Sequence, residues 1–578
     1  MNENLLGMQA APCLCCQINM KKFPFLPAVA FWLLATLPLF GSVLSAAGKA
    51  DANEPRIVNI YNFVRNSDYR VPDSEEVLYE TTRKQIELIK PTGLPATWAL
   101  QYDALINPRY QKLFKEQLGP KDEIAAWWEI PRPLVKKAGL QWRGHDHEWD
   151  STANVGFSPG YTPEERRKLV DIYMADFKAI FGCYPRTVGS WFIDEVTLEY
   201  MAERYGIVAS CNCKDQVGTD GYTLWGGYWN QAYYPSRLNA YMPAQTKAGQ
   251  INVPIFRMLG SDPIYQGYAT GMWTLEPVYP QAGGSTDWVA WFMKEMIQQP
   301  SLGFAYTQAG QENSFGWEAM KTGLTLQIAL LARQAKAGEI QIMTLEQAGE
   351  WFRHKYIVTP PTAVVALDDW KHENRKTVWY DSRFYRLNML WENGRFFIRD
   401  LHCFDQKVVS PTHDSALTTT FLAYETLPMM DSALWSVAGT KPAGMWPVLF
   451  ASDGTTSPMS PEGPPVVKEL NRTDLSITQP LAGGGVFSMI CSEAKIVCTA
   501  VDGDGKPLRW AWNLAGGAQQ QVVVQAVASN GITYHYAGVN YEPKLSSGMG
   551  SCQQLSNGDI RLCPNNSGKL ELFLNVTE

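Results

Sequence analysis

Two of the seven histidines in this chain lie in one short polar segment, Leu140–Asp150, with the sequence LQWRGHDHEWD, which we call the histidine segment. His145 and His147 are two positions apart, so in an extended chain both rings project from the same face. Such a pair, surrounded by carboxylates, is typical of a metal site or a site of proton transfer. A polar loop whose histidines bind backbone groups would have the same composition, and the segment alone leaves both interpretations open.

Other acidic residues follow apolar runs of the kind that form buried strands. Glu129 follows EIAAWW, Asp194 ends TVGSWFID with Glu195 next, and Glu312 follows FAYTQAG. Glycoside hydrolysis needs one acid to protonate the leaving oxygen and a second carboxylate to attack the sugar or activate water. We predict Glu129 and Asp194 as this pair, with Glu312 as a reserve acid. Asp194 is equally well placed to cap the helix that follows it.

A connection rich in Gly, Tyr and Trp, residues 214–250, supplies flat rings of the kind that stack on sugars. Taken singly, each ring is more easily explained as a core residue, but as a cluster in a loop the rings favour ligand contact. We predict substrate contacts from this connection and its surroundings, by His145, His147, Glu195, Trp225, Trp229 and Trp273.

The elements that would position these residues alternate between strand and helix. We predict strands at 56–64, 95–102, 123–130, 140–147, 187–194, 207–213, 251–259 and 302–307, and helices at 74–91, 108–118, 131–137, 162–181, 195–205, 287–298, 317–336 and 345–356. Repeated βα units imply parallel strands with right-handed crossovers, and about seven units indicate an α/β barrel of the (β/α)7 type over residues 56–357. Reacting groups in such barrels gather at the C-terminal strand ends, which places the histidine segment and the candidate carboxylates at one mouth.

The pattern changes after Thr359-Pro360-Pro361. Short β-rich runs then lie between clusters of Gly, Pro, Asn and Asp, as in an all-β sandwich. Residues 358–578 are therefore predicted to form a sandwich-like C-terminal domain.

The N-terminal region resembles a secretory signal. Met20-Lys21-Lys22 is followed by an apolar run to Phe40 and then by small residues, so we take Met20 as the true start and residues 1–50 as a leader. No later apolar stretch is long enough to cross a membrane. We predict a secreted or periplasmic protein without a membrane span in the mature chain.

Net charge bears on the binding partners, and cysteine content bears on disulfide bonds. A net charge of -7 provides no basic surface for nucleic acid. In an oxidising compartment, Cys491 with Cys498 and Cys552 with Cys563 are candidate hairpin disulfides.

Three stretches carry a family resemblance. Gly93–Trp98 (GLPATW), Tyr184-Pro185-Arg186 and the run Thr197–Gly206 resemble motifs of polysaccharide deacetylases, and Gly144-His145 falls where that family has its first metal-binding histidine. The resemblance implies the incomplete barrel that is also found in glycoside hydrolase families thirty-eight and fifty-seven. The family ends its first strand in two aspartates, a base and a metal ligand, whereas this chain reads Ile60–Arg65 (IYNFVR) there. The chain also resembles secreted bacterial proteins described only as domains of unknown function.

We predict a secreted carbohydrate-active hydrolase, in first place a glycosidase without a cofactor, acting on an oligo- or polysaccharide. The first alternative is a metal-dependent polysaccharide deacetylase with a rearranged site, in which His145 and His147 hold zinc or another divalent metal. The second is a carbohydrate-binding or surface-assembly protein that keeps the barrel without catalysis.

Overall fold

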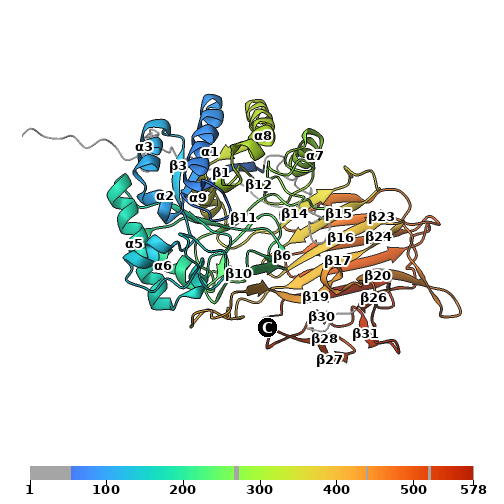
Figure 1. Cartoon of the computed structure of the whole chain (residues 1–578). Helices are drawn as coiled ribbons and strands as arrows, with labels where there is room; N and C mark the ends of the chain where they lie inside the picture. The colour runs from blue at the N-terminus through green and yellow to red at the C-terminus, as the bar shows by residue number, and fades with distance from the viewer. Residues whose placement is uncertain (1–53, 266–272, 438–439, 518–521, 577–578) are drawn as a thin grey trace, which may run out of the picture.

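The computed structural model describes residues 54–265, 273–437, 440–517 and 522–576. An α/β half and an all-β half lie side by side (Figure 1). The predicted leader falls outside the described residues. Among the helices of the described ranges, none combines the length and the apolar character needed to cross a membrane.

The N-terminal half is the predicted incomplete barrel. In the described chain, seven parallel strands follow one another around a nearly closed sheet. A further short strand, β13 (Gln341–Met343), pairs in parallel with β1, and the short antiparallel strand β8 (Ala232–Tyr233) lies at the edge. The parallel strands, in spatial order, are β12 (Ala305–Ala309), β1 (Arg56–Val64), β2 (Thr97–Leu100), β3 (Glu123–Trp127), β4 (Thr187–Gly189), β5 (Ala209–Asn212) and β11 (Ile255–Arg257). The (β/α)7 prediction is confirmed.

Helices cover the outside of this sheet, and their ends follow the local sequence. Thr162 and Glu165 form a reciprocal capping box at the start of α5 (Pro163–Phe181), and Gly182 ends it with φ 85°. The other principal barrel helices are α1 (Ser74–Ile89), α3 (Pro108–Gln117), α4 (Arg132–Lys137), α6 (Glu195–Tyr205), α7 (Thr286–Gln298), α8 (Trp317–Ala337) and α9 (Leu345–Lys355).

The strand predicted at residues 140–147 is absent from this described region. Strand β3 pairs directly with β4, and the histidine segment is an irregular loop after α4. Parallel strands are buried on both faces, and a segment with so many charged side chains cannot be placed there without desolvating them. The prediction is therefore wrong, and the i,i+2 spacing of the histidines has no strand geometry behind it.

The opposite end of the barrel is closed by α9. The buried carboxylate of Glu123, at the start of β3, accepts hydrogen bonds from Thr97 of β2 and Thr187 of β4 and from the backbone N–H of Glu346 in α9. A carboxylate at a helix N-terminus is favoured by the helix dipole. Glu123 thus connects the N-terminal strand ends to the helix that covers them.

The C-terminal half contains two packed antiparallel sheets, as predicted. The sheet next to the barrel contains β14 (Thr362–Ala366), β15 (Lys376–Asp381), β16 (Tyr385–Glu392), β17 (Arg395–Cys403), β20 (Ala443–Phe450), β26 (Trp510–Gly516), β32 (Ile560–Cys563) and β31 (Ser551–Gln554), with β19 (Leu427–Asp431) beside β17. The outer sheet contains β22 (Val466–Glu469), β23 (Leu475–Pro480), β24 (Val486–Ser492), β25 (Lys495–Val501), β33 (Lys569–Phe573), β30 (Lys544–Leu545), β28 (Gly531–Tyr536) and β27 (Val523–Ala528).

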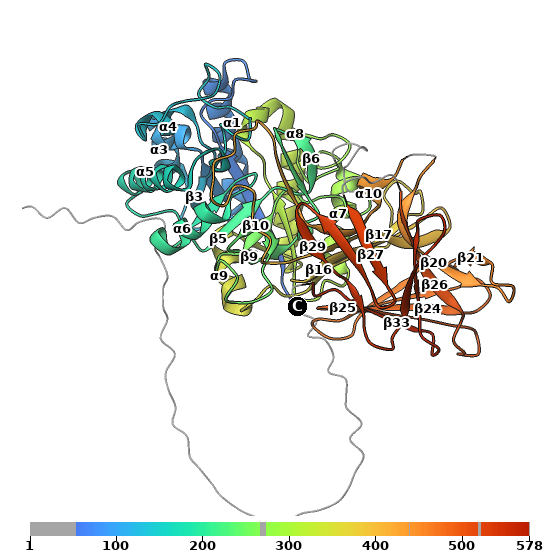
Figure 2. The same ribbon diagram turned by 90° about the horizontal axis from the view of Figure 1, so that it is seen from below.

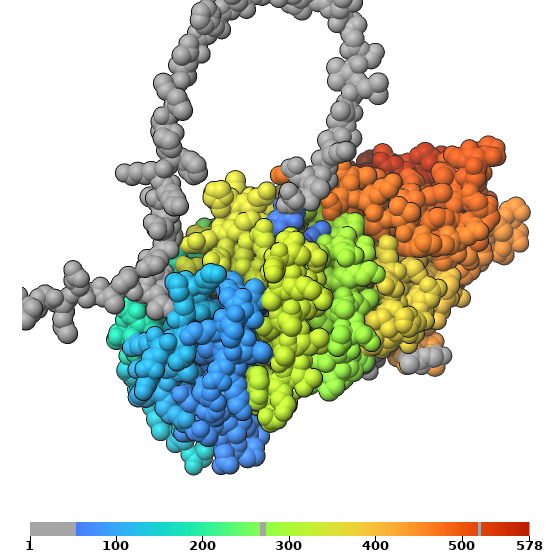
Figure 3. Space-filling model, turned by 90° about the horizontal axis from the view of Figure 1, so that it is seen from above, coloured from blue at the N-terminus to red at the C-terminus, as the bar shows by residue number. Residues whose placement is uncertain are grey.

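Burial shows how the halves join. Strand β24 alternates buried and half-buried residues, whereas β16 is buried along both faces because it packs on the outer sheet and on the barrel. The connection after β5 adds to the contact, since its strand β7 (Tyr222–Trp225) pairs with β18 (Leu422–Glu425) from the other half. Figures 2 and 3 show the two halves in direct contact, seen from below and from above.

Cys491, Cys498, Cys552 and Cys563 form no disulfide in this structure, so the two candidate disulfides are absent. Cys552 lies opposite Leu562 rather than opposite Cys563, which puts the two side chains on different faces of the sheet. Cys491 lies opposite Ile496, and Cys498 is two residues further along that strand, opposite Met489.

Candidate functional site at the barrel mouth

Arg65 directly follows β1 at the C-terminal end of the barrel, with only 1% of its side chain exposed. Its Nε and Nη2 donate to the two oxygens of Glu129 at 2.9 and 2.7 Å, and its Nη1 donates to Glu312 Oε2 at 2.8 Å. Bidentate bonds between a guanidinium and a carboxylate are short and directional. One buried cation therefore joins two strand-end carboxylates.

Parallel topology explains this convergence. Glu129 lies just beyond β3, and Glu312 just beyond β12, so both reach the same end of the sheet as Arg65. Gln101, the residue after β2, donates from Nε2 to Glu129 Oε2. Asp68 adds a third carboxylate, 3.5 Å from Arg65 Nη1 and 2.7 Å from Arg70 Nη2.

The two glutamates differ in their surroundings. Burial raises the pKa of Glu312 to about 7, since Arg65 and Arg70 offset only part of the desolvation and Glu129 adds a like charge. Glu312 can therefore hold a proton near neutral pH. Glu129 accepts two guanidinium N–H bonds and one amide N–H bond, which hold both of its oxygens in position.

The histidine segment lies over this cluster. The ring of Trp149 stacks on Arg65, whose guanidinium carbon is 4.4 Å from the ring centre, and Arg70 lies 4.9 Å from the same ring. Tyr69 is 43% exposed and stacks on His147 with 4.9 Å between ring centres. The segment thus covers the mouth with one buried ring and places exposed rings at its rim.

Neither predicted histidine reaches the glutamates. His145 is 77% exposed, and its Nδ1 lies 2.7 Å from Asp150 Oδ2. The rings of His145 and His147 are 6.5 Å apart at the rim. Their role as substrate contacts stays a prediction.

The residues at the mouth do not fit a divalent metal. The place where the resemblance implies a metal-binding aspartate is followed by Arg65, whose guanidinium occupies the space between Glu129, Glu312 and Asp68. A guanidinium cannot act as a ligand and would repel a second cation at this distance. The zinc considered from the sequence therefore has no ligand set at this position.

Comparison with known proteins gives similarities of fold. No protein-family model and no curated protein matches this chain. Solved structures do. One, from Parabacteroides distasonis, carries a description that combines glycoside hydrolase and deacetylase. It is 15% identical, covers 65% of this chain and 90% of its own, and has a TM-score of 0.48.

Two others are similar over about half of this chain. A protein described as a polysaccharide deacetylase from Mycobacterium smegmatis is 11% identical, covers 54% of this chain and 94% of its own, and has a TM-score of 0.33. A family 4 acetyl xylan esterase from Clostridium thermocellum, solved with a cobalt ion, is 10% identical, covers 52% of this chain and 94% of its own, and has a TM-score of 0.25. These descriptions name carbohydrate-modifying hydrolases, the group that the sequence motifs resemble.

Asp194 takes the second of its two predicted roles, as the N-cap of α6. Its Oδ1 accepts the Thr197 N–H at 2.9 Å as the N-cap of α6 and also bonds Arg166 Nη1 at 3.0 Å, while Oδ2 accepts from Thr197 and Ser158. Both oxygens are therefore engaged in holding α6 and α5 together. Glu312, rather than Asp194, is the carboxylate that shares Arg65 with Glu129.

Glu195 is fully buried and bonds His413, which comes from a loop of the C-terminal half, at 3.0 Å. Burial raises the pKa of Glu195, and the bond to Glu195 raises the pKa of His413. His413 faces a surface pocket of about 400 Å³ between α5 and α6. The substrate contact predicted for Glu195 stays a prediction, and in this structure the residue positions a histidine.

The prediction of substrate contacts is wrong for two of the three tryptophans. Trp225 and Trp229 are only 1% and 2% exposed, and Trp229 stacks on Trp379 of β15 with 4.2 Å between ring centres. They pack in the joint between the halves, where burial removes their apolar surface from water. Trp273 is half-buried and lies 5.0 Å from Trp370.

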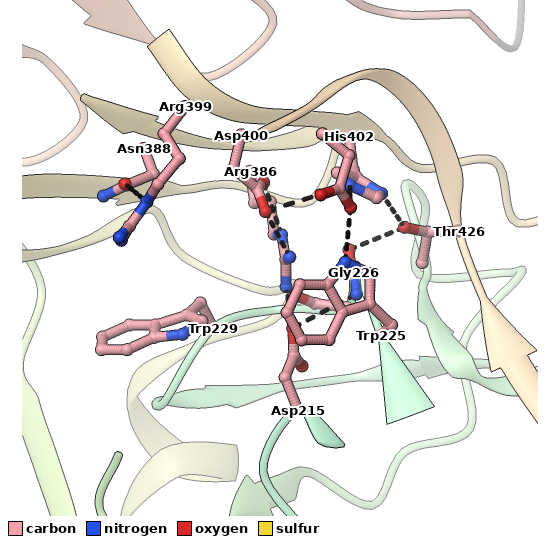
Figure 4. A network of polar contacts seen from close by, with 12 residues as sticks. Asp215, Trp225, Gly226, Trp229, Arg386, Asn388, Arg399, Asp400, His402 and Thr426 are labelled. Carbon is pink, nitrogen blue, oxygen red and sulfur yellow. Dashed lines mark hydrogen bonds and ion pairs between the residues drawn. The ribbon is translucent and has the colours of Figure 1, made fainter. Parts of the chain in front are cut away.

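The joint also contains a charged network that the sequence did not reveal (Figure 4). Arg386 of β16 donates to both oxygens of Asp400 at 2.8 and 2.6 Å and to Asp215 at 2.5 Å, and Arg257 donates to the other oxygen of Asp215 at 2.8 Å. His402 continues the network, with Nε2 3.2 Å from Asp431 Oδ2. We call this set the junction network.

Asp400, His402 and Asp431 lie close enough together to suggest a metal site. Their ligand atoms are already used, because Arg386 binds both oxygens of Asp400 and Trp225 Nε1 donates to Asp431 Oδ2. The group fits a closed hydrogen-bond network better than a metal.

Sequence reasoning missed Arg65, Gln101 and the junction network. Arg65 could have been found, because it directly follows the first barrel strand, at the end where reacting groups of such barrels gather. Asp400 and His402 are two positions apart in β17 and so share one face of the strand. This spacing indicates a buried polar network only once it is known which face of the strand is buried.

Proposed function

We propose that this protein is a carbohydrate-modifying hydrolase, and more specifically a glycosidase in which Glu312 is the general acid and Glu129 the second carboxylate. The observation that carries the proposal is the shared guanidinium of Arg65. It holds both carboxyl groups at one barrel mouth, while burial leaves Glu312 with a pKa of about 7. Two carboxyl groups in different environments are the arrangement that glycoside hydrolysis requires.

In this mechanism Glu312 protonates the glycosidic oxygen as the bond to the leaving sugar breaks. Glu129, held by Arg65 and Gln101, attacks the sugar or takes a proton from the attacking water. Arg65 keeps both groups in position and neutralises the charge left on Glu312 after proton transfer. The exposed rings of Tyr69 and His147 at the rim offer faces for a bound saccharide.

The test is to measure reducing ends and acetate released from a panel of native and acetylated polysaccharides. We expect reducing ends from the natural protein and a loss of about 10²–10⁴-fold in Glu312→Gln and Glu129→Gln, the range for losing a general acid or base. Glu123→Gln, a buried carboxyl at the closed end of the barrel, is the matched control and should keep activity if it folds.

Acetate without reducing ends would instead establish the deacetylase alternative, to which the similar solved structures point by description. Saccharide binding with neither product would indicate a binding protein. Export through the predicted leader remains part of the proposal and would be checked by N-terminal sequencing of protein recovered outside the cytoplasm.

A further inference from the structure

Three aromatic rings enclose a lysine at the surface near the joint of the two halves. Lys371 Nζ lies 3.8 Å from the ring centre of Tyr265, 4.4 Å from that of Trp273 and 5.1 Å from that of Trp370. In the part of the chain that the structure describes, this ammonium has no hydrogen-bond acceptor. Within the described residues, its contacts are with these three rings, which we call the cage.

The cage is held rigidly. Asp369 accepts the backbone N–H groups of Lys371, Glu373 and Arg375 at 3.0 to 3.1 Å, which fixes the loop that carries Trp370. Trp370 Nε1 donates to the buried Asp262 at 2.8 Å. Two walls of the cage thus keep their places whatever residue stands at position 371.

Charge also favours a cation in the cage. The Tyr265 hydroxyl donates to Asp369 and to Glu373, each at 3.0 Å, which leaves the ring electron-rich and two carboxylates behind it. The faces of tyrosine and tryptophan attract ammonium groups, and cages of such rings recognise alkylated ammonium ligands. Arg375, whose guanidinium carbon is 5.1 Å from the Tyr265 ring centre, is paired with Glu373 and Glu392.

We propose that Tyr265, Trp273 and Trp370 form a binding site for an organic ammonium group, and that Lys371 is an internal occupant that such a ligand displaces. None of these residues belongs to the group around Arg65, and the proposal does not depend on the reaction at the mouth. The ligand would be a quaternary amine or the free amine of an amino sugar, which share this chemistry.

The experiment compares the natural protein with Lys371→Ala by calorimetric titration, using choline, its uncharged carbon isostere, glucosamine and N-acetylglucosamine. We expect Lys371→Ala to bind choline or glucosamine at least tenfold more tightly than the natural protein, and to bind neither uncharged analogue. Whichever cation binds identifies the source. Lys371→Arg, which keeps a cation at this position, should bind as weakly as the natural protein.

A second substitution keeps the proposal falsifiable. Trp273→Ala in the Lys371→Ala background should lose the gained affinity while its circular dichroism stays unchanged. If folded Lys371→Ala binds no cation more tightly than the natural protein does, the proposal is overturned. The same holds if the variant loses stability and gains no binding, because Lys371 is then a structural partner of the rings.

Discussion

The barrel mouth and the junction network are both buried clusters of arginine and carboxylate, but their charges are balanced differently. At the junction, Asp215 lies between Arg257 and Arg386. Burial alone would raise the pKa of Asp215, but the two arginines outweigh it and hold the pKa below its ordinary value. At the mouth, Arg65 is shared between Glu129 and Glu312, and burial raises the pKa of Glu312 to about 7.

This difference separates two uses of the same residue types. A carboxylate with a full complement of cations stays ionised and ties segments together, as Asp215 ties the connection after β5 to β16. A carboxyl that shares a cation can change its protonation near neutral pH, which is what acid catalysis requires. Four predictions test this contrast.

The largest stability effect is expected at the junction. Asp215→Asn leaves Arg257 and Arg386 facing a neutral amide, and breaking a buried charged network typically costs about 3–5 kcal/mol. Urea unfolding should show this loss. Asp220→Asn, which disturbs only a half-exposed pair with Arg70, is the control and should change stability by less than about 1 kcal/mol. Equal effects of the two variants would refute the contrast.

The second prediction concerns pH. Between its ordinary pKa of 4.5 and the folded value of about 7, Glu312 keeps a proton that the unfolded chain has lost. Its contribution to stability is complete below pH 4.5 and is lost as the pH rises to 7, by up to about 3 kcal/mol. Denaturation curves of the natural protein and Glu312→Gln over this window measure it as a difference. Parallel pH dependence in the two proteins would contradict the assigned environment.

The third prediction concerns the packing of the junction. Gly226 has φ 84°, and an added Cβ would collide with His402 and Thr426. Gly226→Ala should lower the free energy of unfolding by about 1–3 kcal/mol more than the backbone strain alone. Gly454→Ala supplies that reference, since Gly454 has φ 85° with open space around it. A loss no larger than that of Gly454→Ala would show that the junction can relax.

The smallest effect is expected at the rim. His145 is largely exposed, and exposed ion pairs contribute about 0–1 kcal/mol. The free energy of unfolding of His145→Ala should therefore lie within about 1 kcal/mol of that of the natural protein. Elemental analysis of the two proteins should give the same zinc content. A stoichiometric metal that disappears in the variant would reopen the metal-dependent reading of the mouth.

Much of the fold follows from local pattern. The alternation of apolar strands with amphipathic helices predicted the seven parallel strands, and short signals such as Thr162-Pro163-Glu164-Glu165 located helix ends to within a residue or two. The histidine segment was misassigned because a polar run at the right spacing in the βα order was counted as a strand. Its side chains could not have been buried on both faces of a parallel sheet.

The sequence by itself determined which carboxylates end strands, since strand ends are marked by where apolar runs stop. It named Glu129, Asp194 and Glu312 on that basis. Only the tertiary structure decided that Glu129 and Glu312 share Arg65, and which of its two predicted roles Asp194 takes, as a helix cap beside Arg166. It also buried Trp225 and Trp229 in the joint. These side-chain contacts join residues that are 28 to 247 positions apart, and local spacing carries no information about them.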